Sequence, residues 1–205
     1  MKALIFLIGL SLVPFLLFAQ EDTIPQKKDI SNYQIETARA HRNAANQFFE
    51  DELYYEAIEE YSKAIKSNPY DRIAWYNRSL SYARLEDKER AIQDLSRVLE
   101  LEDGFVAGYF LRGTFSYELE DYRQAKKDFS SIISIRPRSA LSYRKRGTVR
   151  FVMNDRNGAL KDYNESIRID PNDPVSFHDR AVVREYLGDK KGAKDDRKIE
   201  KELGD

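Results

Sequence analysis

The chain has 205 residues, of which 41% are hydrophobic and 34% are charged, and its formal net charge is −1. This length is sufficient for one domain with a substantial core, and the nearly neutral charge argues against a nucleic-acid-binding platform, which is normally basic. The absence of cysteine excludes disulfides, a thiol nucleophile and any thiolate metal site.

Residues 1–19 have the order of a secretory signal peptide. A basic start at Lys2 precedes an almost wholly apolar stretch from Ala3 to Phe18, after which the sequence becomes abruptly polar. The stretch is shorter than the ~20 residues that a membrane-spanning helix prefers, and Pro14 interrupts it. We therefore expect cleavage near Ala19 and an exported protein, located in the periplasm or cell envelope or secreted. An uncleaved membrane anchor is the alternative.

Residues 20–30 are polar and lack periodicity, which predicts a short flexible linker. Ser31, followed three residues later by Gln34, fits a capping box that satisfies two free N–H groups of a helix. The first helix is expected to begin there and to end near Glu50. Its first turns form an N-terminal extension that can cover an otherwise open apolar end of the domain.

A period of 34 residues without insertions or deletions fills the rest of the chain. Five alanines mark it: Ala57, Ala91, Ala125, Ala159 and Ala193. A second column of small residues consists of Ala45, Ser79, Gly113, Gly147 and Ala181. Small residues at a fixed interval mark places where two helices approach closely. The period predicts a helix–turn–helix solenoid over residues 31–205, in which each unit buries its apolar face by stacking on its neighbours. The expected repeats are 38–71, 72–105, 106–139, 140–173 and 174–205.

Turn and cap residues divide each unit into two helices of about 12–14 residues. Aspartates stand at the expected N-cap of the second helix: Asp87, Asp121, Asp155 and Asp189. Prolines close three of the units, at Pro69, Pro137 and Pro171. Aromatic residues at helical spacing are expected to fill the core: Trp75, Tyr82, Tyr109, Phe129, Tyr143, Tyr163 and Phe177.

These columns resemble those of the tetratricopeptide repeat (TPR) family, in which small residues on both helices, aromatic residues and a terminal proline recur every 34 residues. The resemblance extends from Ala38 to about Leu203 and implies an all-α, right-handed superhelical solenoid of antiparallel helix pairs. The second unit departs from the pattern because it lacks the proline. The last helix is nearly all charged, with Arg197 at the aromatic position, and is expected to form a polar terminal cap.

A column of arginines precedes a column of aspartates by 16 residues. The pairs are Arg78 with Asp94, Arg112 with Asp128, Arg146 with Asp162, and Arg180 with Asp196. The spacing links the first helix of a unit to the second. We favour a structural ion pair within each hairpin over a ladder of charge that binds a ligand.

In TPR proteins a second face of the first helix lines the concave surface where peptides or helices bind. The residues on this face here are the candidate groove residues: Arg42, Asn46, Asn77, Tyr76, Leu80, Phe110, Leu111, Tyr117, Arg144, Lys145 and Phe151. The first helices of the second and third units are apolar nearly all round, and this surplus predicts a binding surface. The alternative is that a helix of the same chain, such as the N-terminal extension, fills the groove.

The first three units also resemble, distantly, the TPR domains of heat-shock co-chaperones, which hold a C-terminal carboxylate with five polar residues. Arg42, Asn46 and Asn77 are compatible with that clamp. Ala107 and Leu111 stand where the family uses lysine and arginine, so most of the charge-assisted hydrogen bonding is missing. We therefore do not expect a cytosolic chaperone-tail clamp.

No enzyme, cofactor or metal is predicted, because His41 and His178 lie in different units and no phosphate-binding loop is present. The expected function is a protein–protein interaction module or scaffold that binds a peptide or helix. We expect no nucleic-acid partner, and membrane association only through an uncleaved signal sequence. Two alternatives remain: a chaperone-like holdase for unfolded chains, and an accessory subunit of an enzyme complex.

Overall fold

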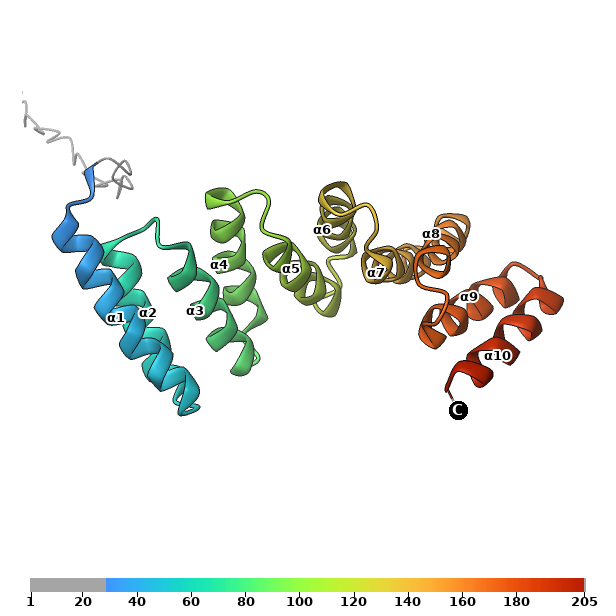
Figure 1. The fold of residues 1–205 in the computed structure, drawn as a ribbon, viewed down its shortest axis with the longest axis horizontal. Helices are drawn as coiled ribbons and strands as arrows, with labels where there is room; N and C mark the ends of the chain where they lie inside the picture. The colour runs from blue at the N-terminus through green and yellow to red at the C-terminus, as the bar shows by residue number, and fades with distance from the viewer. Residues whose placement is uncertain (1–28, 205) are drawn as a thin grey trace, which may run out of the picture.

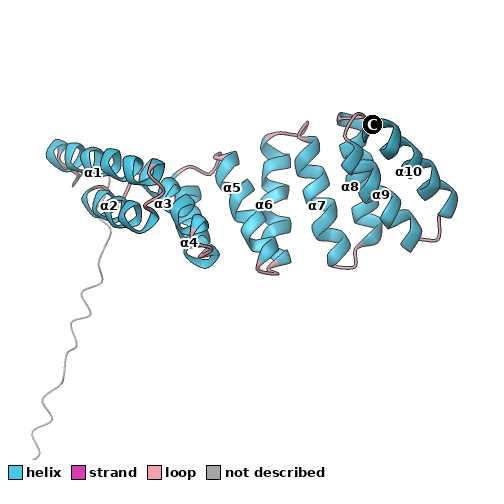
Figure 2. Cartoon of the chain, turned by 90° about the horizontal axis from the view of Figure 1, so that it is seen from below, coloured by secondary structure: helices cyan, strands magenta, loops and turns pink. Residues whose placement is uncertain are grey.

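The computed structural model describes residues 29–204, which form ten α-helices arranged in an open row (Figure 1). The helices are α1 (Asn32–Glu50), α2 (Tyr54–Ser67), α3 (Arg72–Arg84), α4 (Lys88–Leu101), α5 (Val106–Glu118), α6 (Tyr122–Ile135), α7 (Ala140–Val152), α8 (Arg156–Ile169), α9 (Pro174–Tyr186) and α10 (Lys190–Gly204). Each helix packs mainly against the helices before and after it in the chain (Figure 2). The prediction of an all-α solenoid is confirmed. The predicted signal peptide, 1–19, lies outside the described residues.

Side-chain caps begin the helices where the sequence predicts them. Ser31 accepts a hydrogen bond from the Gln34 backbone N–H, and the Gln34 side chain accepts one from the Ser31 backbone, so the capping box is confirmed. The predicted aspartates at the second-helix N-caps all accept a backbone N–H: Asp87, Asp121, Asp155 and Asp189. The residue before the N-cap of each second helix has a positive φ, as the tight turn between the two helices requires. These residues are Glu52, Glu86, Glu120, Asn154 and Gly188.

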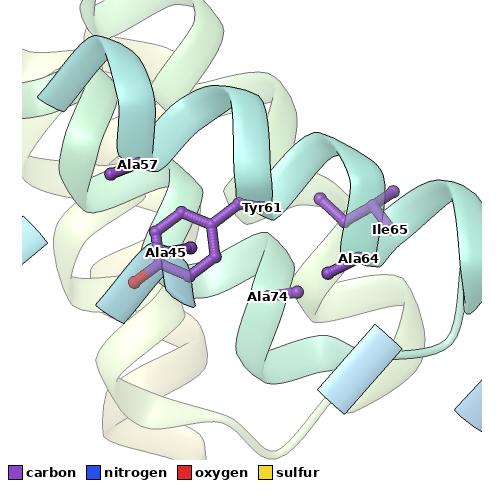
Figure 3. Close-up of a cluster of buried hydrophobic side chains, with 6 residues drawn as sticks. All are labelled: Ala45, Ala57, Tyr61, Ala64, Ile65 and Ala74. Carbon is purple, nitrogen blue, oxygen red and sulfur yellow. The ribbon is translucent and has the colours of Figure 1, made fainter. Parts of the chain in front are cut away.

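The two columns of small residues lie where helices touch. All five alanines of the first column are at most 1% exposed. Ala45 and Ala57, one from each column, pack with Tyr61 in a cluster to which α1, α2 and α3 contribute (Figure 3). At Gly147 an added Cβ would lie 2.8 Å from Cε1 of Tyr163, which is too close for a methyl group. Small residues are therefore required at these contacts, because any larger side chain would separate the helices.

The arginine–aspartate pairs form a buried ladder, which we call the arginine ladder. In each pair, Nε and Nη2 of the arginine donate to the two carboxylate oxygens over 2.7–3.0 Å. The four aspartates are at most 3% exposed. Nη1 of each arginine donates, over 2.8–3.3 Å, to the second helix of the preceding repeat, at Ser62, Ser96, Ser130 and Asn164. The structural interpretation of these pairs is confirmed, and the bond to the preceding repeat adds a link that the sequence did not reveal.

The two ends of the row differ from its middle. In the first repeat, Glu60 occupies the position of the ladder aspartates, and its carboxylate lies 2.7 Å from Nδ1 of His41 instead of pairing with an arginine. In α10, Arg197 is exposed and donates to Glu185 of α9. This position is aromatic or leucine in the other repeats, so α10 presents a polar outer surface, as the cap of a solenoid requires.

Candidate peptide-binding groove

The eleven candidate groove residues lie on the first helices of the first four repeats, α1, α3, α5 and α7, and all are half-buried. Three hollows open between these helices, and we call the surface that contains them the groove. Half-burial suits a recognition surface, because a side chain fixed by its neighbours still presents atoms to a ligand.

The first hollow, of about 260 Å³, lies between α1 and α3 and combines apolar walls with two amides. The Asn46 carbonyl oxygen accepts hydrogen bonds from the Tyr61 hydroxyl at 2.7 Å and from the Asn77 amide at 3.0 Å. Burial raises the pKa of Tyr61 to about 12, so this hydroxyl remains a donor. Phe49 and Leu80 form the apolar walls. The Asn46 N–H₂ group is left without a partner in the described chain and can donate to a peptide carbonyl.

The second hollow, of about 590 Å³, lies at the centre of the groove, between α3, α5 and α7. Its apolar lining includes Tyr76, Phe105, Phe110, Leu111 and Leu141, and the polar residues Glu102, Arg136, Ser139 and Ser142 complete it with others. Tyr76 and Phe105 meet edge to face with ring centroids 5.2 Å apart, and Phe110 meets the buried Phe129 ring in the same way at 6.1 Å. These contacts hold the rings in place. The hollow is large enough for apolar side chains and offers them aromatic walls.

Beyond the centre the groove becomes narrower and more polar. A small hollow between α5 and α7 is lined by Tyr117, Lys145, Thr148 and other residues, and its volume of about 40 Å³ is too small for a side chain. Tyr117 packs on Tyr122 with centroids 5.6 Å apart. Farther along, Phe151 of α7 meets the exposed ring of Tyr186 of α9 at 5.2 Å. Tyr186 therefore extends the aromatic surface into the fifth repeat.

Two of the three predicted cationic groove residues are engaged by aspartates of the same chain. Nη1 of Arg42 donates to both oxygens of Asp71 at 2.6–2.7 Å. Nε of Arg144 lies 3.2 Å from the carboxylate of Asp173. Each aspartate stands 29 residues after its arginine and caps the first helix of the next repeat. These two pairs therefore connect the first helix of a repeat to the turn that begins the next first helix. Arg42 is held by hydrogen bonds, whereas Nε of Arg144 makes no hydrogen bond among the described residues and is held by the ion pair alone.

Lys145 differs from these arginines, because in the described part of the chain its ammonium makes no hydrogen bond or ion pair. One repeat later, at the same helical position, stands Asp179 of α9, which the sequence did not single out. Its half-buried carboxylate likewise has no partner among residues 29–204. Burial raises the pKa of Asp179, although the charges of Arg144, His178 and Lys145 oppose the shift. Asp179 follows Asn77, Leu111 and Lys145 at the 34-residue interval, and this interval could have identified it as a groove candidate from the sequence.

The two histidines lie on different repeats and each contacts a glutamate: Nδ1 of His41 is 2.7 Å from Glu60, and Nδ1 of His178 is 2.8 Å from Glu200. Within residues 29–204 no group of three or more potential ligands could hold a metal ion. No helix of that part of the chain is long and apolar enough to cross a bilayer.

The tetratricopeptide repeat family matches residues 36–104, which comprise the first two repeats with the groove's amide-containing hollow. These repeats are tetratricopeptide repeats. The chain is 35% identical over 80 residues to Hsp70-Hsp90 organizing protein 3 of Arabidopsis thaliana, a match that covers 39% of this chain and 14% of that protein. It is 34% identical over 88 residues to human serine/threonine-protein phosphatase 5, covering 43% of this chain and 18% of that protein. The chain thus spans less than a fifth of the length of these relatives.

Solved structures extend the likeness to nearly the whole solenoid. The crystal structure of MamA superposes with a TM-score of 0.77 at 20% identity, over 82% of this chain and 92% of that one. YrrB, described as a TPR protein with an unusual peptide-binding site, gives 0.74 at 17% identity, over 84% and 88%. The first TPR of RPAP3, bound to the HSP90 peptide SRMEEVD, gives 0.54 at 23% identity, over 58% and 95%. The TPR solenoid fold is therefore established, and it is a fold of protein–protein interaction and peptide-binding modules.

Proposed function

We propose that this protein is an exported TPR scaffold that binds an extended or helical segment of a protein partner in the concave groove of the solenoid. The observation that carries the proposal is the central hollow, where Tyr76, Phe110 and Leu111 remain half-buried around about 590 Å³ of open volume. A folded protein normally covers apolar surface of this kind, and rigid aromatic walls are typical of surfaces that bind partners. The amides of Asn46 and Asn77 in the neighbouring hollow add groups suited to a peptide backbone.

The groove does not reproduce a co-chaperone clamp. Arg42 is held by Asp71, and the two other cationic positions of the clamp are occupied by Ala107, which is exposed, and Leu111. A terminal carboxylate would therefore find few charged donors in the first three repeats. We infer that apolar side chains of the partner supply most of the affinity.

The experiment that tests this function compares a groove variant with a matched control. Partners are captured by crosslinking and pull-down from the native host with wild-type protein, Phe110→Ala/Leu111→Ala, and Tyr55→Ala/Ile135→Ala. The control residues are exposed apolar side chains on second helices, 75% and 42% accessible. We expect the groove variant to bind a stoichiometric partner more weakly by ~2 kcal/mol or more, with unchanged helical content.

Three outcomes would contradict the proposal. Full affinity in the groove variant would place the binding surface elsewhere, on the convex side or the N-terminal extension. Loss of binding in the control variant alone would place it on the second helices. General suppression of aggregation of unrelated unfolded proteins, without a stoichiometric partner, would support the holdase alternative.

Export rests on the order of residues 1–19, namely a basic start, an apolar stretch and a small residue at the polar boundary. We propose that the mature chain begins near Gln20 and works in the periplasm or cell envelope. Intact-mass measurement of the protein from its native host tests this directly. A mass equal to that of all 205 residues would instead support a retained anchor.

A further inference from the structure

Lys145 and Asp179 are two opposite charges that the protein leaves open on one surface. They occupy the same helical position one repeat apart, in register with Asn77 and Leu111, which line the first two hollows. Lys145 itself lines the third hollow. Lys145 therefore belongs to the groove, and Asp179 continues its 34-residue register onto α9. Neither makes a hydrogen bond or ion pair within residues 29–204.

The surroundings of Asp179 favour an incoming donor. The charged groups near its carboxylate are Arg144, His178, Asp173 and Lys145. Arg144 is engaged by Asp173, and His178 contacts Glu200, so neither closes a bond to Asp179. A carboxylate partly removed from water without a donor is unfavourable, and a basic side chain of a ligand would relieve that cost.

Aromatic rings on this part of the groove can contact the rest of a ligand side chain. Tyr117 lines the third hollow with Lys145, and Phe151 of α7 meets Tyr186 of α9, the helix that carries Asp179. The Asp179 charge helps to raise the pKa values of Tyr117 of α5 and Tyr163 of α8, although burial is the main cause for both. The Tyr163 hydroxyl is already committed to Thr148, at 3.2 Å. Asp179 is a half-buried carboxylate of α9 that can receive the charged end of a lysine or arginine, and these rings offer apolar surface to its stem.

We propose that this pair of charges determines the chain direction in which a segment binds in the groove. Lys145 pairs with an acidic side chain of the segment, and Asp179 pairs with a basic side chain one repeat farther along. This proposal rests on the proposed function, since it assigns a partner chemistry to the same groove. A segment bound in the opposite direction would place like charges together at both positions, which is strongly unfavourable. The apolar centre provides affinity, and the two charges fix polarity and register.

A charge exchange tests the proposal. A random-peptide library displayed on phage is selected against the wild-type chain and against Lys145→Glu/Asp179→Lys, which keeps the net charge. We expect wild-type peptides to carry an acidic and a basic residue at a preferred spacing, and peptides for the variant to carry them in the reverse order. In fluorescence anisotropy, each peptide should bind the non-matching protein at least about tenfold more weakly.

The matched control is Lys194→Glu/Asp195→Lys, an equivalent exchange at two exposed positions of α10 outside the groove. It should select the same peptides as the wild type. Identical peptides for the wild type and the groove exchange would overturn the charge proposal. If those peptides still lose binding in Phe110→Ala/Leu111→Ala, the groove function stands without it. A selection that yields no peptide sensitive to Phe110→Ala/Leu111→Ala would overturn both.

Discussion

The arginine ladder and the groove of the fourth and fifth repeats use the same kinds of charged side chain in opposite ways. In the ladder, Arg146 and Asp162 form two hydrogen bonds of 2.9 and 2.7 Å, and the carboxylate is 3% exposed. In the groove, Lys145 is adjacent to Arg146 in sequence but has no partner in the described chain, and neither has Asp179. Charges that close on each other hold the two helices of a repeat together, whereas charges that stay open are available to a ligand.

The first repeat shows why the ladder ends where it does. Each ladder arginine donates its third hydrogen bond to the second helix of the preceding repeat, so the complete arrangement needs a preceding repeat. The first repeat has none within the described residues, and Ala44 and Glu60 replace the pair. The ladder is therefore a device that joins repeats, in addition to joining the two helices of one hairpin.

The largest expected effect comes from opening the ladder. Asp128→Ala removes the carboxylate that receives Arg112 and leaves a guanidinium without its counter-charge, where the carboxylate was 0% exposed. We expect a loss of ~3–5 kcal/mol in the free energy of unfolding, measured by urea denaturation. Asp195→Ala, an exposed carboxylate on α10, is the control and should have little effect. A loss below ~1 kcal/mol for Asp128→Ala would mean that the buried ion pair contributes little to the stability of the solenoid.

A second variant separates close packing from charge. Gly147→Ala leaves Arg146 and Asp162 intact but adds a Cβ at 2.8 Å from the Tyr163 ring. We expect overpacking to lower the free energy of unfolding by ~1–3 kcal/mol, measured by denaturant unfolding. The control is Gly104→Ala, because a Cβ there meets nothing within 4 Å. Equal stability of both variants would show that the helices can separate at this contact without cost.

Glu60→Gln tests the ladder position in the first repeat and should have a smaller effect. Hydrogen bonds from Lys63 and His41 lower the pKa of Glu60 in the folded protein. The ionised carboxylate therefore stabilises the fold at pH values above its unfolded-state pKa, and this stabilisation is lost as the pH falls through the lower folded-state pKa. Because the side chain is partly solvated, we expect at most ~1 kcal/mol at neutral pH. The difference from wild type should vanish in acid. A loss as large as that of Asp128→Ala would contradict the distinction between the first repeat and the others.

The smallest effect on stability is expected at the open groove carboxylate. Asp179→Asn removes a charge that has no partner to lose in the described chain and relieves the unfavourable burial that raises its pKa. The free energy of unfolding should stay within ~0.5 kcal/mol of wild type. Thermal unfolding monitored by circular dichroism checks this. A marked destabilisation would show that Asp179 is a structural group.

The 34-residue period made much of this fold predictable from sequence. The small columns, the aspartate caps and the 16-residue interval between Arg112 and Asp128 each follow from residue type and spacing. The engagement of Arg42 by Asp71 was not predicted, because Asp71 lies in the turn after α2 and its position depends on loop geometry. The isolation of Asp179 was also hidden, since the absence of a partner depends on neighbours from several helices.

The distinction between closed and open charges is tested most directly by one matched pair of variants, Asp162→Asn and Asp179→Asn. Unfolding free energy and affinity for a groove-selected peptide are measured on the same samples, with affinity taken well below the unfolding transition. Asp162→Asn should lose about 3 kcal/mol of stability, while its folded form binds as the wild type does. Asp179→Asn should keep its stability and bind about tenfold more weakly. Equal losses of stability in the two variants, or full affinity in Asp179→Asn, would contradict this account.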